Sequence, residues 1–193
     1  AVAGFHAALF RFTQQATNVV GIPVGGRSLR EFDHTIGCFV NTLLVLVSCF
    51  GEASFIDLLG AVRERMLAAL EHQDLPFERI VEAVRPARSV GLPPLVQVMF
   101  TYHPNDVRAH ATGKARLDPI DLPRPTARFD LECHVTPTAE GLRCRLFVDR
   151  DLISHDTAQS FLITFATLLE EALQRPADRL DALRALPAPL IRA

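Results

Sequence analysis

The strongest constraint on the fold is a nearly continuous apolar run at residues 39–47, interrupted only by Asn41 and Thr42. Such a run is typical of a strand that is buried on both faces of a sheet. Soon after it, apolar residues recur at helical spacing, and Ser54 precedes them as the expected N-cap. This helical stripe consists of Phe55, Leu58, Leu59, Val62, Met66, Leu67 and Leu70. The two segments together predict a sheet with a helix packed against it.

Helices and strands are also predicted along the rest of the chain. Further helices are expected at residues 1–15, 76–84 and 154–173, and a short helix or linker at residues 180–186. Further strands are expected at residues 18–24, 95–101, 128–136 and 141–149, with a short one near residues 117–122. The predicted fold class is therefore α/β (or α+β), a mixed sheet with helices packed on it.

The strands at residues 128–136 and 141–149 alternate strictly between apolar and polar residues, which predicts a hairpin. A four-residue turn at residues 137–140 would place Cys133 opposite Cys144 on the apolar face, and Glu132 opposite Arg145 on the polar face. No pair of cysteines has the C-x-x-C spacing of a zinc or redox site. The cysteines are interpreted as small buried residues in a reducing compartment, so we expect Cys133 and Cys144 to be free thiols.

Composition excludes several classes of protein. The 193 residues fit one domain or one large lobe, and 49% hydrophobic with 22% charged residues argues against disorder. A net charge of −2 gives no support for nucleic-acid binding. The longest apolar stretch spans about 15 residues, short of the ~20 that cross a bilayer. No signal peptide is visible, and the absence of an initial Met is consistent with a fragment.

Several polar residues allow both a structural and a functional interpretation. Gly26 is expected to form a tight turn at the end of a strand, and Arg27 places a positive charge directly after that turn. Asn41 would either fix a neighbouring loop or face a substrate tunnel, and the sequence does not decide between the two. Because no nucleophile lies in a sharp turn nearby, His72 and Asp74 are interpreted as helix caps rather than catalytic groups.

Asp130, Glu132 and His134 alternate along one strand face and form a conceivable set of metal ligands. Alternate polar positions on a hairpin are usually solvated, so this interpretation is not favoured.

Three motifs in fixed order resemble those of a known family. They are Ile-Gly-Cys-Phe-Val-Asn-Thr at residues 36–42, His-Gln-Asp-Leu-Pro-Phe-Glu at residues 72–78, and Arg88 followed by Pro-Leu-Val-Gln-Val-Met-Phe at residues 94–100. Together they resemble the C-terminal lobe of the condensation domains of nonribosomal peptide synthetases. The likeness extends over nearly the whole chain. The family's catalytic His-His-x-x-x-Asp-Gly motif is missing, since no two histidines are adjacent.

The resemblance implies one lobe of a two-lobed, chloramphenicol acetyltransferase-like fold. Residues 1–193 would form the C-terminal lobe without its N-terminal lobe, and residues 187–193 would begin a linker. The lobe would supply a tunnel wall and a crossing loop, made of Gly26, Arg27, Gly37, Phe39, Asn41 and Thr42. Structural motif residues would be His72, Gln73, Asp74, Pro76, Phe77, Arg88 and Gln97. No catalytic residue, cofactor site or metal site is implied within this chain.

The implied function is amide-bond formation between carrier-bound aminoacyl or peptidyl thioesters, in the cytoplasm. Phosphopantetheine arms of carrier proteins would deliver the substrates. The implied partners are the missing N-terminal lobe and the peptidyl carrier and adenylation domains of the synthetase, with no nucleic acid and no membrane. Two alternatives remain at this point: a non-catalytic docking lobe, and part of a coenzyme A-dependent acyltransferase.

Overall fold

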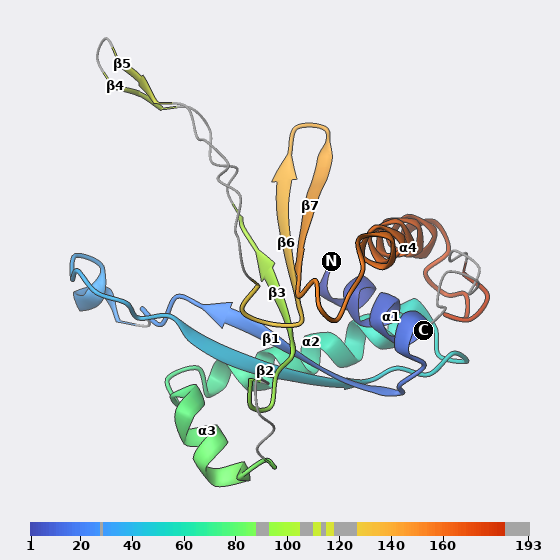
Figure 1. The fold of residues 1–193 in the computed structure, drawn as a ribbon, viewed down its shortest axis with the longest axis horizontal. Helices are drawn as coiled ribbons and strands as arrows, with labels where there is room; N and C mark the ends of the chain where they lie inside the picture. Colours follow the sequence, from blue (N-terminus) through green and yellow to red (C-terminus); the bar gives the residue numbers. More distant parts are fainter. Residues whose placement is uncertain (28, 88–92, 105–109, 113–114, 118–126, 184–193) are drawn as a thin grey trace.

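The computed structural model describes residues 1–27, 29–87, 93–104, 110–112, 115–117 and 127–183. The helices are α1 (Val2–Thr13), α2 (Phe55–Glu71), α3 (Phe77–Val84) and α4 (His155–Gln174), with a short 3-10 helix η1 (Arg30–Phe32). The strands are β1 (Thr17–Val24), β2 (Asn41–Ser48), β3 (Val98–Tyr102), β4 (His110–Thr112), β5 (Ala115–Leu117), β6 (Leu131–Thr138) and β7 (Gly141–Val148). Figure 1 shows their arrangement.

Five strands form one mixed sheet in the order β2-β1-β3-β6-β7, which confirms the predicted fold class. The inner pairs β1–β3 and β3–β6 are parallel, whereas the outer pairs β1–β2 and β6–β7 are antiparallel. Strands β4 and β5 form a separate two-stranded sheet, which stands away from the large one in Figure 1. The connection from β3 to β6 therefore joins two parallel neighbours.

Helices α1, α2 and α4 pack on one face of the sheet, and the core lies between them and the strands. Phe5 of α1 is fully buried at its centre. Its ring lies 5.1 Å from that of Phe100 in β3, and 5.6 Å and 5.8 Å from those of Phe161 and Phe165 in α4. One aromatic cluster thus joins two helices to the middle of the sheet, where edge-to-face pairs add to the free energy of burial.

The prediction that residues 39–47 are buried on both faces was wrong. In β2 the burial alternates, so that Val45 is fully buried while Leu46 is 47% exposed. The reason is position: β2 is an edge strand, and the large helices α1, α2 and α4 all pack on the same face of the sheet. The same one-sided packing leaves Leu59 and Leu67 of α2 half exposed, although both belong to the predicted apolar stripe.

The helix-capping predictions are largely confirmed. Ser54 caps α2 in a reciprocal capping box: its hydroxyl accepts a hydrogen bond from the backbone N–H of Asp57, whose carboxylate accepts one from the backbone N–H of Ser54. His72 is the C-cap of the same helix. The hydroxyl of Ser154 likewise accepts a hydrogen bond at the start of α4.

The hairpin of β6 and β7 forms, but the predicted register was wrong by two residues. Thr138 pairs with Gly141, so the turn holds two residues instead of four. Cys133 then faces Leu146, and Cys144 faces Val135, so that both cysteines stay on the apolar face but are not opposite each other. β6 can continue through Pro137 because its pairing with β3 ends at Val135, and the missing N–H breaks no bond of that ladder. All four cysteines of the chain are free.

The new register also changes the polar face. His134, not Glu132, lies opposite Arg145, and Glu132 lies opposite Phe147. Glu132 was expected to be solvated, yet only 3% of its surface is exposed.

Several predictions fall partly or wholly outside the described residues. The short strand near residues 117–122 overlaps β5 only at Leu117, because residues 118–122 are not described. The helix or linker at residues 180–186 is described only as far as residue 183, and that part consists of turns. Arg88 and the linker at residues 187–193 lie wholly outside.

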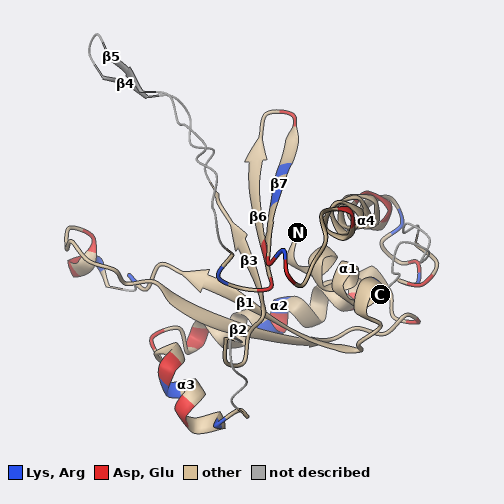
Figure 2. Cartoon of the chain, viewed as in Figure 1, with Lys and Arg blue, Asp and Glu red and all other residues tan. Residues whose placement is uncertain are grey.

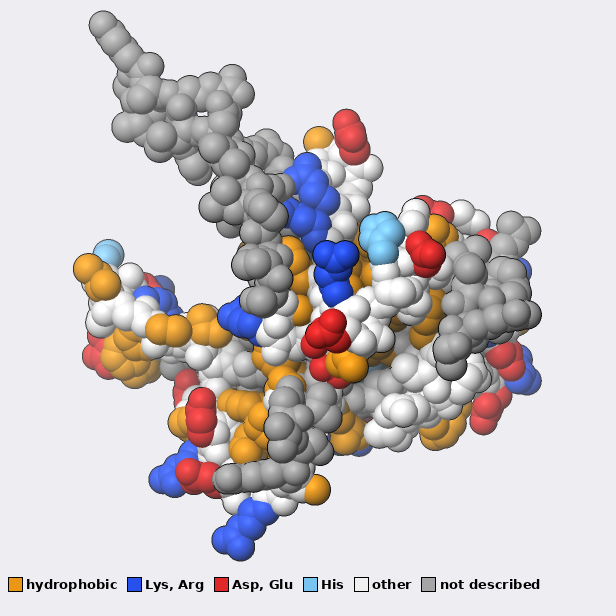
Figure 3. Space-filling view, viewed as in Figure 1, with side chains coloured by type: hydrophobic (Ala, Val, Ile, Leu, Met, Phe, Trp, Pro, Cys, Tyr) orange, Lys and Arg blue, Asp and Glu red, His pale blue; other side chains and the backbone are white. Residues whose placement is uncertain are grey.

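Charged residues are unevenly distributed over the sheet. Strands β1, β2 and β3 contain none, whereas β6 contains Glu132 and β7 contains Arg143 and Arg145 (Figure 2). Figure 3 shows basic side chains gathered beside this hairpin, and hydrophobic ones over the area near α3 and β2. None of the helices in the described part of the chain is long and apolar enough to span a bilayer.

Candidate functional site

The segment between β1 and β2 is organised around Arg27. The guanidinium of Arg27 lies 4.3 Å from the centroid of the Phe39 ring, a cation–π contact. It also donates hydrogen bonds to the backbone carbonyls of Phe32 and, at 3.4 Å, Gly37. One side chain therefore connects three points of the segment. This arrangement gives the segment a defined internal structure.

Gly26 makes this arrangement possible. It has a φ of +62°, and a Cβ atom placed on it would lie 1.8 Å from the carbonyl oxygen of Phe39. No side chain fits that space, so the backbone at residue 26 lies directly against the backbone at residue 39. The two ends of the segment are thereby held together before β2 begins.

Asn41, the first residue of β2, connects this segment to the turn between α2 and α3. Its side-chain Nδ2 donates to the backbone carbonyls of Gln73 and Leu75, both at 2.8 Å. Its Oδ1 accepts a hydrogen bond from the backbone N–H of Phe77 at 3.0 Å. The side-chain amide thus makes three hydrogen bonds to backbone, and the interpretation as a loop-fixing amide is the one that the geometry favours.

The start of α3 explains why a side chain from another element is needed. The N-cap of α3 is Pro76, whose side chain makes no capping hydrogen bond, and the N–H of Phe77 is satisfied by Asn41 instead. The expectation that Asp74 caps this helix was therefore wrong. His72 is directed back to its own helix, where Nδ1 lies 3.0 Å from the carbonyl oxygen of Ala68.

A surface hollow of about 310 Å³ lies where the two motifs meet. Among the predicted site residues, those that line it are Gly26, Phe39, Asn41, Thr42, Gln73, Asp74, Pro76 and Phe77. Cys38, an exposed free cysteine, also lines the hollow. Two sequence motifs that are some thirty residues apart thus form one surface, which no local pattern in either of them reveals.

The third motif lies elsewhere. Gln97 directly precedes β3. Its side-chain Nε2 donates a hydrogen bond to the backbone carbonyl of Pro93 at 3.1 Å, and its backbone carbonyl accepts one from the N–H of Leu131 at 3.2 Å. It therefore supports the start of the β3–β6 ladder and does not line the hollow.

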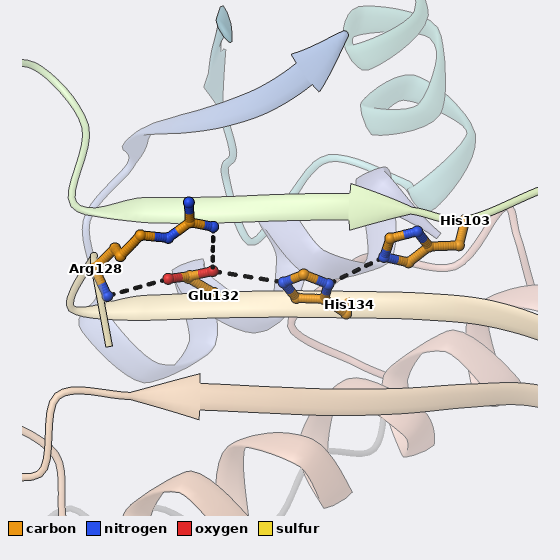
Figure 4. Close-up of polar contacts among 4 residues, drawn as sticks. All are labelled: His103, Arg128, Glu132 and His134. Atoms are coloured by element: carbon orange, nitrogen blue, oxygen red, sulfur yellow. Dashed lines mark hydrogen bonds and ion pairs between the residues drawn. The ribbon is translucent and has the colours of Figure 1, made fainter. Parts of the chain in front are cut away.

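A second polar cluster lies along β6, where Glu132 and His134, suggested by the sequence only as conceivable metal ligands, contact Arg128 and His103 (Figure 4). The carboxylate of Glu132 accepts a hydrogen bond from the backbone N–H of Arg128 at 3.2 Å, and the Arg128 guanidinium lies 3.7 Å away. His134 Nε2 lies 3.5 Å from the same carboxylate, and His134 Nδ1 lies 3.0 Å from Nε2 of His103. The sequence signal for it is the alternation of Glu132 and His134 along one strand face, whereas their contacts with Arg128 and His103 have no local signal.

The histidine rings of this cluster are also packed. His103 stacks on His134 with a centroid distance of 5.3 Å, and Phe147 contacts His134 edge-on at 5.2 Å. Within the described ranges, no group of three or more histidine, cysteine or acidic side chains could hold a metal.

The buried thiols are poor nucleophiles. Burial raises the pKa of Cys49 to about 11, and burial together with the neighbouring Cys144 raises the pKa of Cys133. A thiol whose pKa is raised stays protonated near neutral pH and reacts slowly. Cys49 and Cys133 are therefore poorly suited to covalent catalysis.

Comparison with known proteins agrees with the motifs. The family model described as "Condensation domain" matches residues 1–189. The chain belongs to the condensation-domain family. Bacitracin synthase 1 of Bacillus licheniformis is 33% identical over 175 residues, which cover 91% of this chain and 3% of that protein. Phosphinothricin tripeptide synthetase PhsB of Streptomyces viridochromogenes is 36% identical over 194 residues, which cover 99% of this chain and 16% of that protein.

Solved structures of condensation-domain proteins have the same fold. The four-domain nonribosomal peptide synthetase holo-AB3403, bound to AMP and glycine, superposes with a TM-score of 0.89 at 21% identity, covering 97% of this chain and 15% of that one. The first condensation domain of the CDA synthetase superposes with a TM-score of 0.75 at 23% identity, covering 96% of this chain and 41% of that one. This chain thus spans about two fifths of a solved condensation domain, and far less of the complete synthetases.

Proposed function

We propose that residues 1–193 form the C-terminal lobe of a condensation domain that joins carrier-bound aminoacyl or peptidyl thioesters by an amide bond. Residues 187–193 would begin the linker to the next domain. The proposal is carried by the match of residues 1–189 to the family together with the Asn41 hydrogen bonds, which join two family motifs into one surface. The share of 41% of a solved condensation domain supports the assignment to one lobe.

In this proposal the chain supplies positioning and not proton transfer. The catalytic histidine would come from the N-terminal lobe, because His-His-x-x-x-Asp-Gly does not occur in this sequence. The segment held by Arg27 and Phe39 would form the tunnel wall and crossing loop, and Asn41 would keep that wall fixed to the α2–α3 turn. A rigid wall matters because holding two reactants in a productive geometry can contribute about 7–11 kcal/mol to lowering a barrier.

The partners and location follow from the same proposal. Carrier proteins would present substrates on phosphopantetheine arms, an adenylation domain would load them, and the reaction would take place in the cytoplasm. This chain would bind no cofactor of its own.

The test compares the chain alone with the chain inside a complete domain. The purified chain, mixed with two loaded carrier proteins, is expected to form no dipeptide. A chimera in which residues 1–189 replace the matching segment of a bacitracin synthase 1 condensation domain is expected to form one. Dipeptide formation by the isolated chain would refute the proposal.

The alternatives give different outcomes in the same assays. A folded chimera that binds carriers but forms no product would support a docking lobe. Acyl transfer from a coenzyme A thioester, with no transfer from loaded carriers, would support an acyltransferase.

A further inference from the structure

The buried carboxylate of Glu132 lies between the two ends of one long connection. Strand β3 ends at Tyr102, level with Val135 of β6, whereas β6 begins at Leu131, level with Val98 of β3. Parallel neighbours cannot be joined by a tight turn, so the chain has to return to the opposite end of the shared ladder. We call residues 104–127, which make this return, the crossover segment. His103, just after β3, precedes this segment, and Arg128, shortly before β6, follows it.

Both of these end residues contact the same row of side chains. Arg128, at the return end, donates its backbone N–H to Glu132 Oε1 and places its guanidinium 3.7 Å from Oε2. His103, at the departure end, contacts His134, which lies 3.5 Å from Glu132 Oε2. Figure 4 shows the four side chains in line along β6. No other described strand of the large sheet has an acidic residue within it.

Burial makes this carboxylate a strong anchor. At 3% exposure, an ionised carboxylate without compensating contacts is strongly unfavourable, so the positions of its cationic and N–H partners are tightly constrained. Arg128 itself is mostly exposed, and what fixes it is its contact with Glu132 and not its own packing. The buried Glu132 therefore fixes the positions of the residues at the two ends of the crossover segment.

We propose that Glu132 is a positioning residue that holds both ends of the crossover segment on one face of β6, the return end through Arg128 and the departure end through His134 and His103. The inference concerns His103 and Arg128, the described residues that flank the crossover segment. It does not depend on the proposed function, and its test needs no activity assay.

Hydrogen exchange measured by mass spectrometry on the full 193-residue chain tests this arrangement. Glu132→Gln keeps the shape of the side chain and removes its charge. Exchange should become about tenfold faster in peptides covering both residues 98–104 and residues 127–131, the change that corresponds to about 1.4 kcal/mol. Exchange in β1 and β2 should not change. The matched control is Glu140→Gln, an exposed carboxylate in the β6–β7 turn, which should alter neither flank.

Two variants separate the ends and remain informative if Glu132→Gln does not fold. Arg128→Met should speed exchange at residues 127–131 only. His134→Phe keeps an aromatic ring beside Phe147 but removes both nitrogen contacts, so it should speed exchange at residues 98–104 only. Equal effects of either variant on both flanks, or faster exchange throughout the sheet, would overturn the proposal.

A spectroscopic readout distinguishes positioning from general stabilisation. The imidazole ¹⁵N chemical shifts of His134 and His103 should change in Glu132→Gln, because the carboxylate fixes which nitrogen of His134 carries a proton. Those of the exposed His155 should stay as they are. Unchanged shifts at His134 would contradict the inference even if the chain were destabilised.

Discussion

His6 makes the stability of this chain depend on pH in a way that can be calculated. It lies in α1 and is fully buried, and neither ring nitrogen has a hydrogen-bond partner among the described residues. Burial lowers its pKa from 6.5 to about 4. Between these two values the folded chain keeps His6 neutral while the unfolded chain binds a proton. The stability that depends on neutral His6 is therefore fully present above about pH 6.5 and is lost as the pH falls toward 4.

The size of the effect follows from the two pKa values. The contribution of His6 to the free energy of unfolding should fall by about 2 kcal/mol between about pH 7.5 and about pH 5, and by about 3 kcal/mol once the pH is below both values. For a chain whose total stability is of the order of 5–15 kcal/mol, this is a large fraction.

The assay is urea unfolding, followed by circular dichroism, at both pH values for the natural chain and for His6→Leu. The substitution should remove about 2 kcal/mol of the pH dependence, and it should stabilise the chain near pH 7.5 because two unsatisfied nitrogens disappear. His155→Leu, at an exposed histidine, is the control and should keep the pH dependence of the natural chain. If His6→Leu and the natural chain lose the same stability between the two pH values, the reasoning is wrong.

Three further predictions concern Asn41, Gly26 and Ser54. Asn41→Ala removes three hydrogen bonds and should lower the free energy of unfolding by about 2–3 kcal/mol in urea titrations, with a loss below about 0.5 kcal/mol contradicting its linking role. Gly26→Ala should cost about 1–3 kcal/mol because of the positive φ and the clash with Phe39, whereas Gly25→Ala, which meets no atom within 4 Å, should cost far less. Ser54→Ala should cost about 1 kcal/mol through loss of the α2 cap, and an unchanged melting temperature would argue against the capping box.

The helices were predictable because their signals are local. Apolar residues at helical spacing and a capping serine define α2 within one stretch of sequence, and Ser154 begins α4 in the same way. These features depend on neighbours within one or two turns, so no knowledge of the rest of the fold is needed. The hairpin of β6 and β7 was found for the same reason.

The errors arose where a distant element decides the outcome. The apolar composition of β2 indicates burial, but whether one or both faces are covered depends on its place at the edge of the sheet. The register of β6 and β7 was wrong because the length of the turn was inferred from Pro137, and the sequence does not show that the pairing with β3 has already ended there.

Most residues that line the hollow were named from the sequence, but their contacts were not. The motifs at residues 36–42 and 72–78 identified the family from sequence alone, since a family pattern is carried by residue identity and order. Only the tertiary structure decided that Asn41 forms hydrogen bonds with the second motif, and that Glu132 is buried beside Arg128 and His134. A side-chain hydrogen bond across some thirty residues depends on how β2 and the α2–α3 turn are placed together. Likewise, the burial of one carboxylate depends on which strands flank it, and neither property is encoded in the residues next to it in the chain.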